Sequence, residues 1–186
     1  MTGAKEPAEP QHEPTEQHEP TEQHEPTEQQ RAAARLEALA AEEAELVFDA
    51  FDNDTAWRLG CRLAEAARAA GLPVAIGVRR GAQRLFHLAL PGTCADNDAW
   101  LDRKARVVER FGRSSFRVGS DCTARGRTFE QVYRLDADTF AAHGGAFPVT
   151  VRGVGVVGSV GVSGLPQEQD HAFVVEQVRA FLAGDD

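Results

Sequence analysis

The chain has 186 residues, 42% of them hydrophobic, and a formal net charge of −9. This length suits one domain with an appendage, and the apolar fraction suffices for a core that needs neither disulfides nor a structural metal. Three cysteines without paired spacing, no apolar leader and no run of 18 apolar residues lead us to expect a cytoplasmic protein without a membrane partner.

Acidic residues are concentrated at the start of the chain. Residues 1–30 hold eight glutamates and one lysine, and the hexapeptide Gln-His-Glu-Pro-Thr-Glu occurs three times, from Gln11, Gln17 and Gln23. The repeats have no apolar side chain to bury and a proline in every copy, so the sequence predicts a disordered acidic tail over residues 1–30 and a single domain over residues 31–186. The nearly balanced charge of that domain argues against nucleic-acid binding.

Hydrophobic periodicity and turn residues divide the domain into helices and strands. The first half reads as a helix from about residue 30 to residue 50, a second helix after the capping residues 52–55, and a hairpin of residues 74–78 and 84–90. The second half reads as a helix from residue 96 or 97 to residue 111, a short strand at 114–119, helical turns at 128–133, a hairpin of residues 147–152 and 156–163, and a final helix carrying an apolar stripe at 174–182.

This order of elements predicts the fold class. Hairpins force antiparallel pairing, and the helices between them must cover the sheet. We therefore expect an α+β domain in which helices flank an antiparallel sheet, in preference to a doubly wound parallel sheet.

Residues 153–158 match the dinucleotide motif G-x-G-x-x-G by letter. The motif requires a helix that opens on the glycines and an acidic residue about 20 positions further on, whereas more strand follows here. The glycines are better interpreted as a tight turn, with places where a backbone, a flat ligand or a neighbouring subunit approaches the strand.

A histidine beside two glycines marks the loop before the second hairpin. His143 is of a type that ligates metal or haem iron, and Gly144 and Gly145 can present backbone N–H groups to a ligand. A tight turn whose imidazole makes a local hydrogen bond is the alternative. At the start of the last helix, Asp170 and His171 point about 100° apart, so each would meet a different partner; helix-dipole stabilisation by acidic residues is the plainer explanation.

Arginines recur on one face of the third helix, at steps of three and four residues. Such a stripe can bind carboxylates or phosphates, and the propionates of a tetrapyrrole are suitable partners. A solvated or subunit-facing surface, paired with Asp102 and Glu109, is the alternative. The stripe consists of Arg103, Arg106, Arg110 and Arg113.

Several runs of residues, taken together, resemble the haem-degrading-domain proteins of the GlcG-like and PduO C-terminal-like superfamily. The resemblance covers about residues 35–184, outside the repeats. The runs are FDNDTAW at 51–57, NDAWL at 97–101, RKARVV at 103–108, RSS at 113–115, HGGAFP at 143–148 and VSGLPQ at 162–167.

The resemblance implies a profilin-like antiparallel sheet of about five strands, assembly into dimers or larger homo-oligomers, and a link to haem or corrinoid binding and haem breakdown. It also implies that His143, Gly144, Gly145 and the region from Arg103 to Ser115, which includes Ser114, line the pocket.

These observations lead to one main hypothesis and two alternatives. The main hypothesis is a cytoplasmic homo-oligomer that binds haem or a related tetrapyrrole, with arginines at the propionates and His143 or His171 near the metal. Whether it also degrades haem is open, because no motif of a known enzyme class marks a reaction. The alternatives are an assembly protein without a small ligand and an enzyme acting on a small organic acid.

Overall fold

The computed structural model describes residue 2 and residues 25–184, so the predicted disordered tail lies mostly outside the described residues. Helix α1 (Glu28–Glu45) begins two residues before residue 30, the expected end of that tail. The Thr27 hydroxyl accepts a hydrogen bond from the backbone N–H of Gln30, and the Gln30 side chain accepts one from the N–H of Thr27. This capping box fixes the start of α1, because it satisfies N–H groups that lack helical partners.

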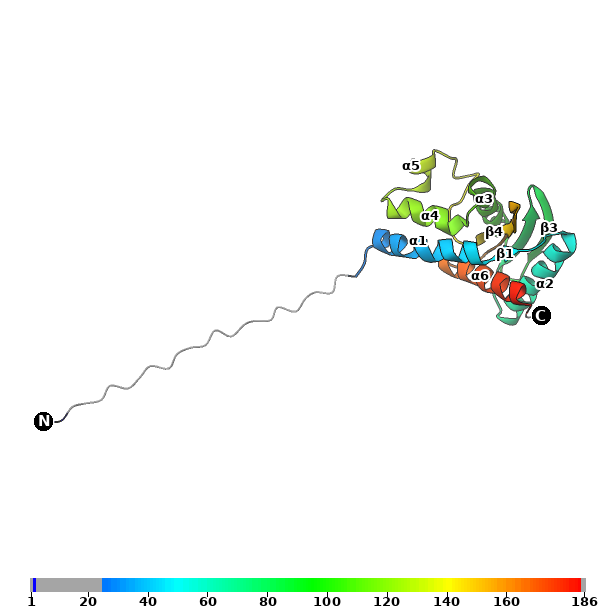
Figure 1. Ribbon diagram of the computed structural model, residues 1–186, viewed down its shortest axis with the longest axis horizontal. Helices are drawn as coiled ribbons and strands as arrows, with labels where there is room; N and C mark the ends of the chain where they lie inside the picture. Colours follow the sequence, from blue (N-terminus) through cyan, green and yellow to red (C-terminus); the bar gives the residue numbers. More distant parts are fainter. Residues whose placement is uncertain (1, 3–24, 185–186) are drawn as a thin grey trace.

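The domain is α+β, as the sequence predicts, with six helices and five strands in residues 25–184. One sheet contains all five strands, in the order β1-β4-β5-β2-β3. Figure 1 labels β1, β3 and β4 among the helices that flank the sheet. After α1 the elements are β1 (Val47–Phe48), α2 (Asn53–Ala69), β2 (Ala75–Arg80), β3 (Gln83–Ala89), α3 (Ala95–Phe111), α4 (Ser115–Ala124), α5 (Phe129–Tyr133), β4 (Ala146–Val151), β5 (Gly155–Ser163) and α6 (Gln167–Ala183).

Both predicted hairpins are present, and β2 also pairs with β5 in the antiparallel sense. The fifth strand, β1, pairs with β4 in parallel, so the sheet is mixed. About a hundred residues separate these two strands, so no hairpin dictates their relative direction. The turn between β4 and β5 places Gly153 and Gly155 at positive φ, which confirms a turn in place of a nucleotide loop.

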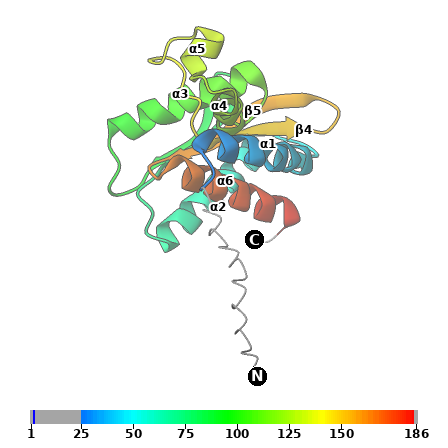
Figure 2. The same cartoon turned by 90° about the vertical axis from the view of Figure 1, so that its left-hand side faces the viewer.

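Helices cover both faces of the sheet. Figure 2 shows α3, α4 and α5 on one side of β4 and β5, with α2 and α6 on the other. The main apolar core lies among the sheet, α2 and α6, and it includes Phe48, Leu59, Leu63, Ile76, Phe147, Val162 and Val178. A smaller cluster lies beneath α3, α4 and α5 and contains Val107, Val118, Cys122, Phe129 and Ala142. The helices within residues 25–184 include none with the length and apolarity needed to cross a bilayer.

Two predicted elements are wrong. The first helix was expected to continue to residue 50, but it ends at Glu45 and Val47–Phe48 form β1. Burial of Phe48 in the main core outweighs local helical periodicity there. The strand expected at residues 114–119 is the first half of α4, because the Ser114 hydroxyl accepts a hydrogen bond from the N–H of Arg117 and caps a helix.

Candidate functional site

His143 lies in the loop between α5 and β4, where it borders two hollows. The larger hollow, of about 680 Å³, is lined by the start of α1, by α4 and by residues 126–131. The smaller hollow, of about 300 Å³, is lined by α3, the segment that follows β5 and the start of α6. Gln167 also lines both hollows, so His143 and Gln167 stand at their boundary.

The His143 imidazole is held by an aromatic contact. Its ring lies edge-on to the indole of Trp100, with centroids 5.3 Å apart and planes at 83°. The Arg103 guanidinium lies 4.1 Å from the centroid of the same indole. Trp100 is itself fixed by donating a hydrogen bond from Nε1 to Asp96, at 3.1 Å. Since all three supporting residues are on or beside one face of α3, the helix positions His143.

The surroundings favour the neutral form of His143. Partial withdrawal from solvent lowers the pKa of this imidazole below its usual value, and the positive charges of Lys104 and Arg103 lower it further. The side chain nevertheless remains exposed. A neutral, accessible imidazole is the form that binds a metal ion or accepts a proton.

The two glycines after His143 serve close packing. A Cβ on Gly144 would lie 1.9 Å from the carbonyl oxygen of Gln167, and one on Gly145 would lie 2.5 Å from that of Val162. The Gly144 N–H donates to Oε1 of Gln167 at 3.4 Å, and the Gly145 carbonyl accepts from the N–H of Val162 at 2.8 Å. The pair therefore lets the His143 loop approach α6 and β5, and the Gly144 N–H expected to face a ligand faces Gln167.

The larger hollow contains a buried hydroxyl without a partner. Ser120 on α4 is 3% exposed, and its Oγ has no hydrogen-bond partner among the described residues. The walls also carry the Phe116 ring and two cations, Arg35 and Arg127. A buried hydroxyl without a partner costs free energy unless a ligand or a water supplies the missing bond.

The predicted arginine stripe is directed at the protein itself. Arg106 donates to the carbonyl of Thr139 at 3.2 Å, Arg103 donates to that of Ala137 at 3.5 Å, and the Arg110 guanidinium lies 5.8 Å from the Phe140 ring centroid. These arginines hold the segment that leads to His143 against α3. None of them lines either hollow within the described ranges.

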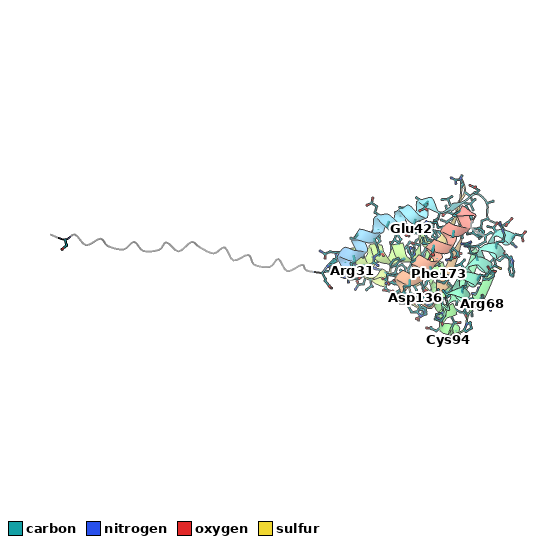
Figure 3. All side chains as sticks on the ribbon, turned by 90° about the horizontal axis from the view of Figure 1, so that it is seen from below. Arg31, Glu42, Arg68, Cys94, Asp136 and Phe173 are labelled. Atoms are coloured by element: carbon teal, nitrogen blue, oxygen red, sulfur yellow. The ribbon has the colours of Figure 1, made fainter. Side chains whose placement is uncertain are left out.

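Ser114 and His171 also lie apart from the hollows. Ser114 is buried as the cap of α4, and its N–H donates to Glu43 of α1 at 2.8 Å. His171 is 4% exposed and lies between Phe116 and Phe147. Its Nε2 pairs with Glu42 of α1 at 3.0 Å, while Nδ1 is buried without a partner in the described part of the chain. Figure 3 shows Glu42 on α1 beside α6, which carries Phe173.

A buried ion pair forms the floor of the smaller hollow, and sequence reasoning missed it. Lys104 Nζ lies 2.7 Å from Asp170 Oδ2, and the two residues are 4% and 1% exposed. Asp170 also accepts hydrogen bonds from the N–H groups of Gly164 and Leu165. The available signal was Lys104 itself, because it is a charged residue on the apolar side of an amphipathic helix.

Residues 25–184 contain no cluster of three or more side chains that could together bind a metal ion.

Comparison with known proteins places the chain in a family. The model of the family described as haem-degrading HbpS-like proteins matches residues 51–179. The chain belongs to this family. The matched segment of the HbpS-like family includes His143, Trp100 and the Lys104–Asp170 pair, whereas α1, which closes one side of the larger hollow, lies outside it.

Other members are similar over most of the chain. A UPF0303 protein of Streptomyces coelicolor is 58% identical over 144 residues, which are 77% of this chain and 91% of that protein. One from Edwardsiella ictaluri is 47% identical over 147 residues, 79% of this chain and 94% of the relative.

Solved structures share the fold. The crystal structure of the Ybr137w protein is 30% identical, with a TM-score of 0.76 over 84% of this chain and 94% of that one. A PduOC–haem complex superimposes with a TM-score of 0.61 at 17% identity, over 70% of this chain and 94% of the other. The latter likeness concerns the fold alone.

Proposed function

We propose that the protein binds haem or a closely related tetrapyrrole in the larger hollow, with His143 at the iron. The observation that carries the proposal is an exposed imidazole, with a lowered pKa, at the wall of a hollow of about 680 Å³. This volume lies within the range of about 300–1,000 Å³ typical of small-molecule sites. The choice of ligand is supported by the description of the family as haem-degrading and by the complex that PduOC, a protein of the same fold, forms with haem.

The residues of the larger hollow suit a flat, anionic ligand. Phe116 lines the hollow with the Arg35 guanidinium 5.0 Å from its ring centroid, and Arg35 also pairs with Glu28 and Glu168. Arg127 donates to the Gln131 carbonyl. In this proposal the propionates replace these partners of the two arginines, and the macrocycle lies against Phe116. Arg35 and Arg127 thus take the place of the arginine stripe of α3, whose contacts hold the His143 segment. The buried Ser120 hydroxyl supplies an unused hydrogen bond. Bound haem would supply iron redox chemistry, while these residues bind and orient it.

A hemin titration tests the proposal. We expect a saturable Soret shift with the full chain and its loss in His143→Ala. His87→Ala is the matched control, since His87 lies on β3, pairs with Asp98 at 2.7 Å and borders neither described hollow. An equal, saturable shift in the wild type and His143→Ala would show that His143 is not the iron ligand. An unsaturable shift in the wild type would show that hemin binds at no specific site.

Haem breakdown is a second step of the same proposal. It requires a reductant and oxygen, so the full chain with bound hemin would be incubated with ascorbate in air. We expect loss of the Soret band faster than for free hemin and slower in His143→Ala. Equal rates of Soret loss for bound and free hemin would show that the protein binds hemin without promoting its breakdown.

Self-association is the proposed assembly state. Trp57 on α2 is 61% exposed and packs edge-on against Phe86 of the edge strand β3, which places a large aromatic surface beside an unpaired strand edge in the described fold. A native mass spectrum measures the subunit number. We expect an oligomer that Trp57→Gln weakens, and a monomeric mass for the wild type at micromolar concentration would contradict this.

A further inference from the structure

The smaller hollow holds a buried amine whose chemistry goes beyond tetrapyrrole binding. The chain has 18 arginines and two lysines, Lys5 and Lys104. Lys104 is placed in the middle of α3, almost fully buried, where it lines a hollow of about 300 Å³. An arginine would pair with Asp170 at least as well, but its guanidinium stays protonated and is a poor nucleophile.

We propose that Lys104 is a carbonyl-reactive amine, which captures a small uncharged aldehyde or ketone in the smaller hollow as a reversible imine, with Asp170 as its proton partner. Lys104 Nζ donates to Asp170 Oδ2 at 2.7 Å and to the Val162 carbonyl at 3.4 Å. Gly145 leaves room beside the amine, since a Cβ there would lie 2.7 Å from Nζ. The amine is therefore fixed but not covered by a side chain from that position.

The pair can supply every proton that the step needs. Asp170 accepts a proton from the Lys104 ammonium, and the free amine then attacks the carbonyl carbon while the C=O π electrons move to oxygen. A second proton transfer gives the neutral carbinolamine. Asp170 returns its proton to the hydroxyl, which leaves as water as the C=N bond forms. The net change is ammonium plus carbonyl compound to protonated imine plus water, with Asp170 ionised before and after the step, and it needs neither an oxidant nor a reductant.

Burial acts on both partners in the direction that this chemistry requires. It lowers the pKa of Lys104 and raises the pKa of Asp170, although their mutual attraction opposes both shifts. A desolvated lysine of this kind is a typical imine-forming group.

The other walls of the hollow limit the ligand. Trp100 and the Asp96 carboxylate line the same hollow. With Asp170 already paired to Lys104, the remaining negative charge disfavours a carboxylate-bearing ligand. A volume of about 300 Å³ lies at the lower limit for ligand sites, so a compact aldehyde fits best.

Reductive trapping tests the proposal on the full chain. The protein would be incubated with propanal and sodium cyanoborohydride, digested, and mapped by mass spectrometry for propyl groups on Lys104 and Lys5. The ratio of Lys104 to Lys5 labelling in buffer is compared with the ratio in urea, where both amines belong to an unfolded chain. We expect the native ratio to exceed the urea ratio severalfold, because burial lowers the pKa of Lys104 and leaves more of it as free amine.

Two variants separate chemistry from structure. Lys104→Arg keeps a cation beside Asp170 and should show no label at position 104, with normal labelling of Lys5. Asp170→Asn frees more of the amine by removing its anion, but it also removes the group that returns a proton to the leaving hydroxyl, so labelling of Lys104 should slow. A native ratio equal to or below the urea ratio would overturn the proposal and leave the pair as a structural contact. Hemin is absent from this experiment, so failure of haem binding and failure of imine formation are distinguished.

Discussion

The imidazole of His143 meets the indole of Trp100 edge to face, with ring centroids 5.3 Å apart. The same indole carries the Arg103 guanidinium at 4.1 Å, so a residue from a loop is fixed by two residues from a helix. Contacts of both kinds contribute about 0.5–1.5 kcal/mol each. The orientation of His143 is therefore set by α3. Binding of a ligand by His143 should depend on residues of α3 that do not contact the ligand.

Trp100→Ala should weaken hemin binding. Loss of the aromatic contact leaves the His143 ring free to adopt other orientations, and about 1.4 kcal/mol of lost positioning corresponds to a tenfold higher Kd. The measurement is a hemin titration followed at the Soret band. Trp57→Ala controls for the loss of an indole that lies on α2 and lines neither described hollow, and a native mass spectrum of this variant separates any change in self-association from a change in hemin binding. Equal affinities for both variants would contradict the positioning role.

His143 should make folding stability depend on pH. Because the folded state lowers the pKa of this imidazole, its contribution to stability is present above the ordinary pKa of 6.5 and is lost as pH falls through the lowered value. Solvent screens an exposed group, so the slope should be shallow. Urea midpoints measured from about pH 7 to about pH 5 should fall in the wild type and fall less in His143→Gln. The same slope in both proteins would show that other groups cause it.

The buried Lys104–Asp170 pair should be strongly non-additive. Lys104→Met leaves the Asp170 carboxyl buried without its cation, and Asp170→Asn leaves the ammonium without its anion. Each single change should lower the free energy of unfolding by about 3–5 kcal/mol. The double variant Lys104→Met with Asp170→Asn should lose less than the sum, because it leaves no unpaired charge. Urea denaturation measures the cycle, and simple additivity would argue against a coupled pair.

Gly119 on α4 controls the approach of the His143 loop. A Cβ at this position would lie 2.0 Å from the carbonyl oxygen of Ala142, so Gly119→Ala must displace the loop or α4. We expect a loss of about 1–3 kcal/mol in unfolding free energy, together with weaker hemin binding. Ser120→Ala, one residue further on, is the stability control, since it removes an unpaired buried hydroxyl and should not destabilise. Equal stability of wild type and Gly119→Ala would refute the packing argument.

The sequence predicts the fold better than the site. Hairpins, helix caps and apolar stripes are local, so periodicity and turn residues locate four of the five strands; β1 was missed because two residues carry no periodicity. At the site, the two glycines that follow His143 are the sequence signal that makes it a candidate, but no sequence signal gives the direction of the arginine stripe. Helical spacing shows that Arg103, Arg106 and Arg110 share a face, and it cannot show that residues 136–140 fold back onto that face.

Long-range contacts set the remaining features of the site. Lys104 and Asp170 are 66 residues apart in the chain, and Glu42 and His171 are 129 apart. Periodicity marks Lys104 as a charge on the wrong side of its helix, which is a usable signal for a buried partner. It gives no information on which carboxylate provides that partner, because β5 and α6 bring Asp170 there through tertiary packing.

The position of the first turn of α1 has a kinetic consequence. Glu28 and Gln29 line the larger hollow, so the acidic repeats are covalently joined to the domain at that hollow. The last turn of α6 lies at the other end of the domain (Figure 1). The net negative charge of residues 1–30 repels an arriving anion, and dissolved salt weakens this repulsion. Hemin should therefore associate faster with the full chain as ionic strength rises, and an affinity tag belongs at the C-terminal end of the domain, away from the larger hollow.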